Sequence, residues 1–129
     1  MSTPHLPPDV PTGPVPARVV PLICDLGEAG GHRVHLLSLE VWPAFADLRF
    51  ARVDGGRAAP LSRRVPPAAA WQVTVDGAPV EVWEVVGRGD RRFSNGEVRL
   101  RPAPPAGARL AVTVRLTPDG EPLHAEVTT

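Results

Sequence analysis

The sequence has no lysine and no tyrosine, and it has a single cysteine, Cys24. All 14 basic residues are therefore arginine, and they balance 14 acidic residues. Arginines selected for phosphate binding would be expected to leave a net positive charge, so neutrality argues against a nucleic-acid or anionic-membrane partner. One cysteine cannot form an internal disulfide, which removes one reason to expect an oxidising compartment.

Long apolar runs are also missing. No stretch approaches the roughly 20 apolar residues that a membrane-spanning helix needs, and the first residues have neither the basic nor the apolar segment of a secretory signal. We therefore expect a cytoplasmic protein without a membrane partner. Helical periodicity over three turns is absent too, and 17 prolines with 12 glycines make long helices difficult to build.

The abundant prolines gather first at the N-terminus, where residues 1–17 contain six of them and almost no large apolar side chain. Such a segment cannot bury enough surface to offset the entropy lost on ordering. The sequence therefore predicts two parts: a disordered proline-rich tail over 1–17 and one folded domain over 18–129.

Strand patterns fill the domain. Segments expected as strands are Arg18–Leu26, with Pro21 at an edge or bulge, His32–Trp42, with a local irregularity, and Ala46–Asp54. A hairpin is expected from Trp71 to Val86 around Asp76-Gly77, and Asn95-Gly96 is expected to form a further turn before Val98 and Leu100. Leu110 to Leu116 and Leu123 to Val127 complete the pattern, with Pro102–Gly107 as a crossing loop.

Seven or eight short strands without helices predict an all-β sandwich or barrel. We favour an immunoglobulin-like antiparallel β-sandwich, because the two long proline-rich connections suit crossovers between sheets. The Cys…Trp…Cys pattern of antibody domains is absent, so this expectation concerns architecture only.

Catalytic and metal-binding motifs are not visible in the sequence, so we expect neither an enzyme nor a cofactor. His32 and His35 stand three positions apart, and on a strand such side chains point to opposite faces, which argues against a shared metal ion. We expect both at the surface or rim. Cys24 follows Leu22-Ile23, where a free cysteine usually acts as a small buried apolar group.

The candidate interaction surface is centred on Trp83. Alternation places Trp83 on the face opposite Val80, Val82 and Val86, so that it could form an exposed apolar strip with Val85. Three arginines follow closely, Arg88, Arg91 and Arg92, and Arg63-Arg64 could add to a local basic patch, although solvated loops are the simpler interpretation. Trp71 shares a face with Val73 and Val75 and is expected in the core.

Three segments carry a family resemblance: Glu40-Val41-Trp42, Trp71 to Gly77, and Pro102 to Leu110. They resemble small uncharacterised immunoglobulin-like sandwich proteins of high-GC bacteria, over about residues 18–128. The chain departs from that pattern at Ala78-Pro79-Val80, where the family usually has Thr-x-Tyr. The resemblance implies a fold and carries no activity.

These observations predict a non-catalytic protein-binding or scaffold module that meets a protein partner, a second copy of itself included, through a sheet face or an edge strand. The alternative is a sandwich that binds a small molecule or a carbohydrate. An exposed Trp83 on a flat face favours the first function, whereas Trp83 in a concave site among polar groups favours the second.

Overall fold

The structure, a computed structural model, describes residues 18–55, 65–90 and 92–129. The tail expected over 1–17 lies outside these residues. Eight strands and one short 3-10 helix make up the described part. They are β1 (Arg18–Ala29), β2 (His32–Val41), β3 (Ala46–Asp54), η1 (Ala68–Ala70), β4 (Trp71–Val75), β5 (Ala78–Gly89), β6 (Phe93–Arg101), β7 (Arg109–Val114) and β8 (Leu123–Thr128). None of the helices in the described ranges is long and apolar enough to cross a membrane.

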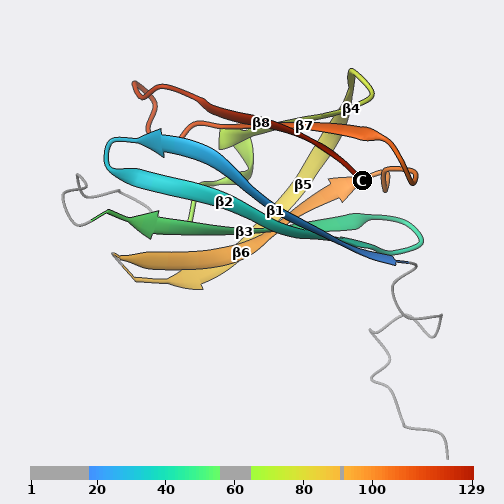
Figure 1. The fold of residues 1–129 in the computed structure, drawn as a ribbon, viewed down its shortest axis with the longest axis horizontal. Coiled ribbons are helices and arrows are strands. Elements are labelled where there is room, and N and C mark those ends of the chain that lie inside the picture. The colour runs from blue at the N-terminus through green and yellow to red at the C-terminus, as the bar shows by residue number, and fades with distance from the viewer. Residues whose placement is uncertain (1–17, 56–64, 91) are drawn as a thin grey trace, which may run out of the picture.

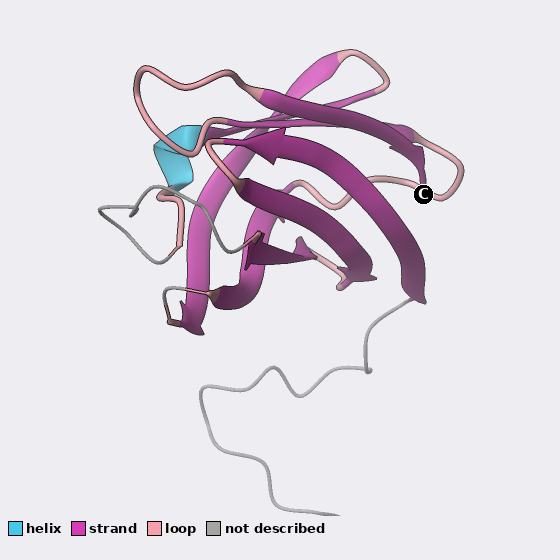
Figure 2. Ribbon diagram, turned by 60° about the vertical axis from the view of Figure 1, so that its left-hand side comes forward, coloured by secondary structure: helices cyan, strands magenta, loops and turns pink. Residues whose placement is uncertain are grey.

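All strand pairs are antiparallel, and the hydrogen-bonded order is β1-β2-β3-β6-β5-β4-β7-β8. The two ends of this order, β1 and β8, come into contact, so the sheet is nearly closed and barrel-like. Figure 1 shows β4, β7 and β8 above β1, β2, β3 and β6, and Figure 2 shows the same strands curving around the interior. The all-β prediction and its strand count are confirmed.

Strand β5 makes the sheet continuous. Its first residues, Ala78–Val80, pair with β4, and the stretch 81–89 pairs with β6. Figure 1 shows β5 crossing diagonally between the two groups of strands. The hydrogen bonding therefore makes one sheet that folds over on itself.

The turn between β4 and β5 forms where the sequence predicts it. Asp76 and Gly77 have φ angles of 49° and 84°, the left-handed conformations that a two-residue hairpin turn of this kind requires. Asp76 also accepts a hydrogen bond on its side chain from the backbone N–H of Arg109, at 2.9 Å, which ties the turn to β7.

The prediction of a turn at Asn95-Gly96 is wrong. Both residues lie inside β6, and the chain reverses earlier, after Gly89. Gly96 lies opposite Gly87, and a Cβ atom at Gly96 would overlap the carbonyl oxygen of Val86. Glycine is thus required here because β5 and β6 approach closely. A prediction based on turn-forming residue types does not detect this requirement.

The core is built from the inward-facing residues of every strand. Trp71 is buried, as predicted, and its ring lies 4.9 Å from that of Phe50 between centroids. Cys24 is half-buried and packs against the core as expected of a small apolar group. The fully buried members of the core include Leu36, Leu39, Leu48, Leu100, Leu110, Val112 and Val114.

Arg52 is the most deeply buried charged side chain among the described residues. Arg52 is fully buried and donates hydrogen bonds to Ser94 Oγ at 3.0 Å, His32 Nδ1 at 2.8 Å and the Asp90 carbonyl at 2.8 Å. The expectation of a surface or rim position is therefore wrong for His32, which is buried as a partner of Arg52. His35 is half-exposed on the opposite face, as the spacing predicts. These bonds join the ends of β2, β3 and β6.

Candidate functional site

Trp83 is exposed to solvent, with 45% of its surface accessible. It occupies a bulge, because Val82 pairs with Leu100 and the next paired residue, Glu84, lies opposite Arg99. The extra residue shifts the alternation of β5 by one position. Val85 consequently packs toward the core while Val86 is exposed, the reverse of the sequence expectation. The structure does not bring Val85 and Trp83 together in one strip.

The ring of Trp83 is already occupied on one side. The guanidinium carbon of Arg101 lies 4.5 Å from the ring centroid, and Glu81 accepts two hydrogen bonds from Arg101, at 3.0 and 3.1 Å. Phe45 meets Trp83 edge-on at 6.2 Å and stacks with Trp42 at 6.0 Å. Contacts within the chain therefore already occupy part of the Trp83 ring.

Charged residues continue from Trp83 across β5, β6, β3 and β2. Arg99 pairs with Glu84 at 2.9 Å and with Asp47 at 3.2 Å, and Arg49 pairs with Glu40 at 2.6 Å and with Glu97 at 3.4 Å. We call this set the charged face. Burial raises the pKa of Asp47, and the positive charge of Arg99 opposes that rise.

The predicted arginine group is only partly described. Arg88 and Arg92 are both exposed near the end of the β5–β6 hairpin. Arg91, Arg63 and Arg64 lie outside the described residues. A basic patch formed by all of them stays a prediction.

A second exposed surface, which the sequence analysis missed, lies on the outer face of β1 and β2. Ile23 is 86% exposed, Val19 61% and Leu37 40%, and Pro21 is exposed beside them. Pro21 lies opposite Ser38 and Cys24 lies opposite Leu36, so Leu37 stands across from Leu22-Ile23. We call Val19, Pro21, Ile23 and Leu37 the β1–β2 patch.

The backbone at the centre of this patch is unusual. Ile23 has a φ angle of +47°, which a β-branched side chain rarely adopts because its Cβ crowds the backbone. It lies in a bulge where two residues of β1 face one residue of β2. The irregular backbone directs the large apolar side chain of Ile23 into solvent. Residues with strained backbones of this kind cluster at functional sites.

Charges beside the patch pair with one another. Arg33 bonds to Asp25 at 2.5 Å and to Glu28 at 3.4 Å at one end, while the Glu40–Arg49 pair flanks the other. The pKa of Asp25 is lowered chiefly by the hydrogen bond from the Gly27 backbone N–H, with a further contribution from Arg33. An apolar partner could thus cover the patch without stranding a charge.

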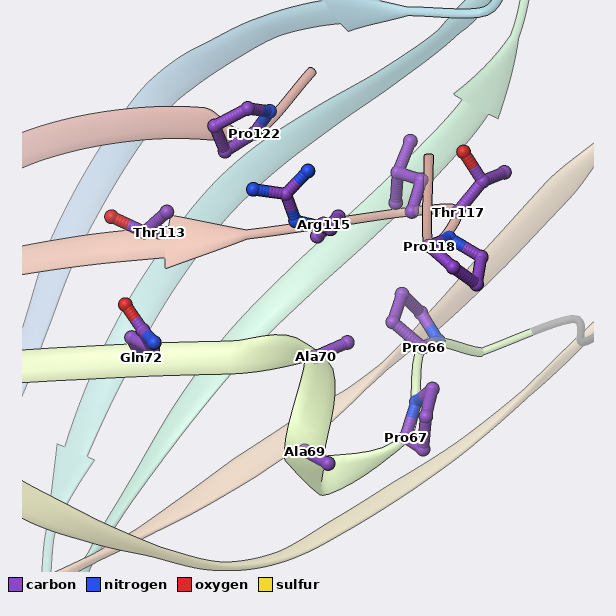
Figure 3. A pocket seen from close by; sticks show the side chains of 11 residues that line it. Pro66, Pro67, Ala69, Ala70, Gln72, Thr113, Arg115, Thr117, Pro118 and Pro122 are labelled. Carbon is purple, nitrogen blue, oxygen red and sulfur yellow. The ribbon is translucent and has the colours of Figure 1, made fainter. Parts of the chain in front are cut away.

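Two cavities adjoin β4. A groove of about 370 Å³ lies over the ends of β4 and β7, between the segment before η1 and the loop after β7 (Figure 3). A more open cavity of about 490 Å³ lies where β4 and β5 separate, beside Trp71, Val80 and Val82. Neither of these cavities is lined by Trp83.

The described residues contain no group of three or more histidine, cysteine or acidic side chains that could hold a metal ion. The thiol of Cys24 donates to the Asp25 carbonyl at 3.9 Å, whereas a nucleophilic thiolate needs a base and an electropositive setting.

Comparison of the chain with protein families, with curated proteins and with solved structures found no match.

Proposed function

We propose that this protein is a non-catalytic interaction module that associates with a second copy of itself through the β1–β2 patch. The observation that carries the proposal is the exposure of three large apolar side chains, Val19, Ile23 and Leu37, on neighbouring strands. Contiguous exposed apolar groups on a soluble domain usually mark a site that another molecule covers.

A second copy is the partner that the patch fits best. The patch itself has no charge, and its flanking charges are paired internally. A two-fold axis through the patch would place apolar side chains of one copy against the same side chains of the other, as in the isologous interfaces of most homodimers. The partner then needs no additional charge complementarity.

The contact should be face to face and not a continuation of the sheet. β1 is the last strand of the hydrogen-bonded order, but its outer edge lies against β8, and two register shifts interrupt its pairing with β2, one after Pro21 and one after Asp25. Proline has no N–H to donate, and bulged strands resist edge-to-edge pairing. Both features favour the outer face as the contact surface.

The test is the oligomeric state as a function of concentration, measured by sedimentation velocity and native mass spectrometry. The expected result is a monomer–dimer equilibrium for the full chain and a monomer for Ile23→Asn. Asparagine adopts positive φ more readily than isoleucine, so this variant should fold at least as stably, which a thermal unfolding curve checks.

The matched control is Val53→Asn, which changes an exposed apolar residue on β3, away from the patch. It should dimerise like the unaltered chain. A full chain that stays monomeric to its solubility limit would refute self-association. A loss of dimer in both variants would move the interface away from the β1–β2 patch.

The immunoglobulin-like relationship and the cytoplasmic location are also proposals. Eight antiparallel strands in two groups joined by β5 support the relationship, while a single nearly closed sheet is the feature that departs from a two-sheet sandwich. The lone cysteine supports a reducing compartment.

The alternative function, binding of a small molecule or a carbohydrate, is favoured by one observation, the groove over β4 and β7. A sugar site at Trp83 is disfavoured, because Arg101 already stacks on the Trp83 ring. If the protein binds a small molecule, we expect it in the groove over β4 and β7 and not at Trp83, where the sequence predicts it.

A further inference from the structure

We infer that the groove over β4 and β7 is a binding site for a small carboxylate ligand that has an apolar body. Its volume, about 370 Å³, falls within the range of about 300–1,000 Å³ that is usual for small-molecule sites. The groove lies apart from the β1–β2 patch, so this inference does not depend on self-association.

The walls of the groove are apolar and stiff. Four prolines line it, Pro66, Pro67, Pro118 and Pro122, together with Ala69, Ala70 and Leu116. Figure 3 shows Pro66, Pro67 and Pro118 grouped at one side of the site. Proline has few conformations to lose, so a wall of this composition is already arranged for an apolar ligand before it binds.

The polar groups of the groove come from neighbouring positions on two strands. Gln72 of β4 pairs directly with Thr113 of β7. Arg115, the first residue after β7, also lines the groove, and its backbone N–H donates a hydrogen bond to the Ala70 carbonyl at 3.0 Å. Figure 3 shows the Gln72 and Thr113 side chains at the same level on adjacent strands and the Arg115 guanidinium beside Pro122. Strand register therefore places Gln72 beside Thr113, and the segment just after β7 adds Arg115 to the lining of the same groove.

Charge decides the ligand class. Arg115 is the only residue with a formal charge among the described residues that line the groove. Its Nη1 donates a hydrogen bond to the Gly120 carbonyl at 2.6 Å, which fixes the side chain against the loop. A guanidinium carries five N–H donors, so further donors remain for an acceptor from a ligand.

A carboxylate is the complementary group. It accepts hydrogen bonds from a guanidinium in a planar, charge-assisted geometry, and the amide N–H groups of Gln72 add donors on the next strand. Thr113 supplies a hydroxyl that already bonds His124 Nδ1 at 2.8 Å, which holds its orientation. The proline walls then contact the apolar part of the ligand.

The experiment is a titration of the full chain with sodium benzoate, followed by 1H–15N NMR. Benzamide serves as the neutral probe of the same shape, and sodium acetate as the carboxylate without an apolar body. We expect saturable shifts from benzoate at Gln72, Thr113 and Arg115, and weaker binding of both other probes.

Two variants test the assignment. Arg115→Gln should weaken benzoate binding about tenfold, because a hydrogen bond to a charged group is lost, while the glutamine can still reach the Gly120 carbonyl. Gln72→Leu changes the other strand without touching that loop and should also weaken binding. Arg109→Gln, at an exposed arginine of β7 outside the groove, is the control.

The inference fails if benzoate causes no saturable shift at the groove, if benzamide binds as tightly as benzoate, or if Arg109→Gln weakens binding as much as Arg115→Gln. If Arg115→Gln disturbs the loop, Gln72→Leu alone decides the outcome. The oligomeric state measured in the same samples reports on the β1–β2 patch separately.

Discussion

The outer face of β1 and β2 and the charged face of β3, β6 and β5 both display large apolar side chains, but they accommodate them differently. On the charged face, Trp83 is covered by Arg101, which Glu81 holds in place. On β1 and β2, Ile23 extends into solvent from a strained backbone. Exposure of an apolar residue thus has two meanings in one sheet.

The difference teaches that exposure has to be considered together with the neighbours of the side chain. Trp83 is the more conspicuous residue in the sequence, because surface tryptophan is uncommon and often marks interfaces. Contacts within its own chain already cover part of the Trp83 ring, so a second molecule would bury less additional surface there. The smaller aliphatic patch, with paired charges only at its margins, has more to gain from being covered.

The largest expected effect concerns the buried Arg52, whose hydrogen bonds join the ends of β2, β3 and β6 beneath the two faces. Arg52→Ala should lower the free energy of unfolding by about 3–5 kcal/mol, because its buried partners His32 and Ser94 would lose their hydrogen bonds. Arg49→Ala, three residues along the same strand, should cost about 0–1 kcal/mol, since its ion pairs are partly solvated. Chemical denaturation of both variants measures the two losses, and equal losses would contradict the structural role assigned to Arg52.

An intermediate effect tests whether Trp83 is satisfied by its own chain. Arg101→Gln should lower the free energy of unfolding only slightly, because a solvent-exposed cation–π contact is weak. The Trp83 indole resonance should move in the 1H–15N spectrum while that of the buried Trp71 stays in place. Dimerisation should be unchanged. A variant that loses its dimer would transfer the interface from the β1–β2 patch to the charged face.

Much of the fold could be predicted from the sequence where alternation is regular. β3 begins and ends at the expected residues, Ala46 and Asp54, and the Asp76-Gly77 turn lies where its residue types indicate. The buried Arg52 was detectable by the same rule, because the alternation that places Leu48 and Phe50 inside also places residue 52 inside. Arginine is seldom buried, and that general tendency obscured the local pattern.

The surfaces were harder to predict because bulges decide them. One extra residue in β5 exchanges the faces of Val85 and Val86, and a bulge in β1 exposes Ile23. Neither follows from local propensity, since a bulge depends on how two strands pair across the sheet. The groove was also not predictable, because it joins a segment before β4 to a loop after β7.

The smallest expected effect compares one carboxylate from each face by its pH dependence. Burial raises the pKa of Asp47 above its usual value of 3.8, so the folded state binds more protons than the unfolded state and loses stability as pH rises through this range. Asp47→Asn removes that loss, keeps an acceptor for Arg99, and should gain stability relative to the unaltered chain as the pH rises above 3.8.

Asp25→Asn should show the opposite slope. The pKa of Asp25 is lowered from 3.8, mainly by the Gly27 N–H, so its stabilising contribution is present above that value and is lost as the pH falls through the lowered pKa. Asp25→Asn should therefore be at its greatest disadvantage near neutral pH. Unfolding curves of both variants at several pH values measure the two slopes. Slopes of the same sign would contradict this contrast. Solvent would then screen Asp47 as fully as it screens Asp25, and the two faces would not shift carboxylate pKa values in opposite directions.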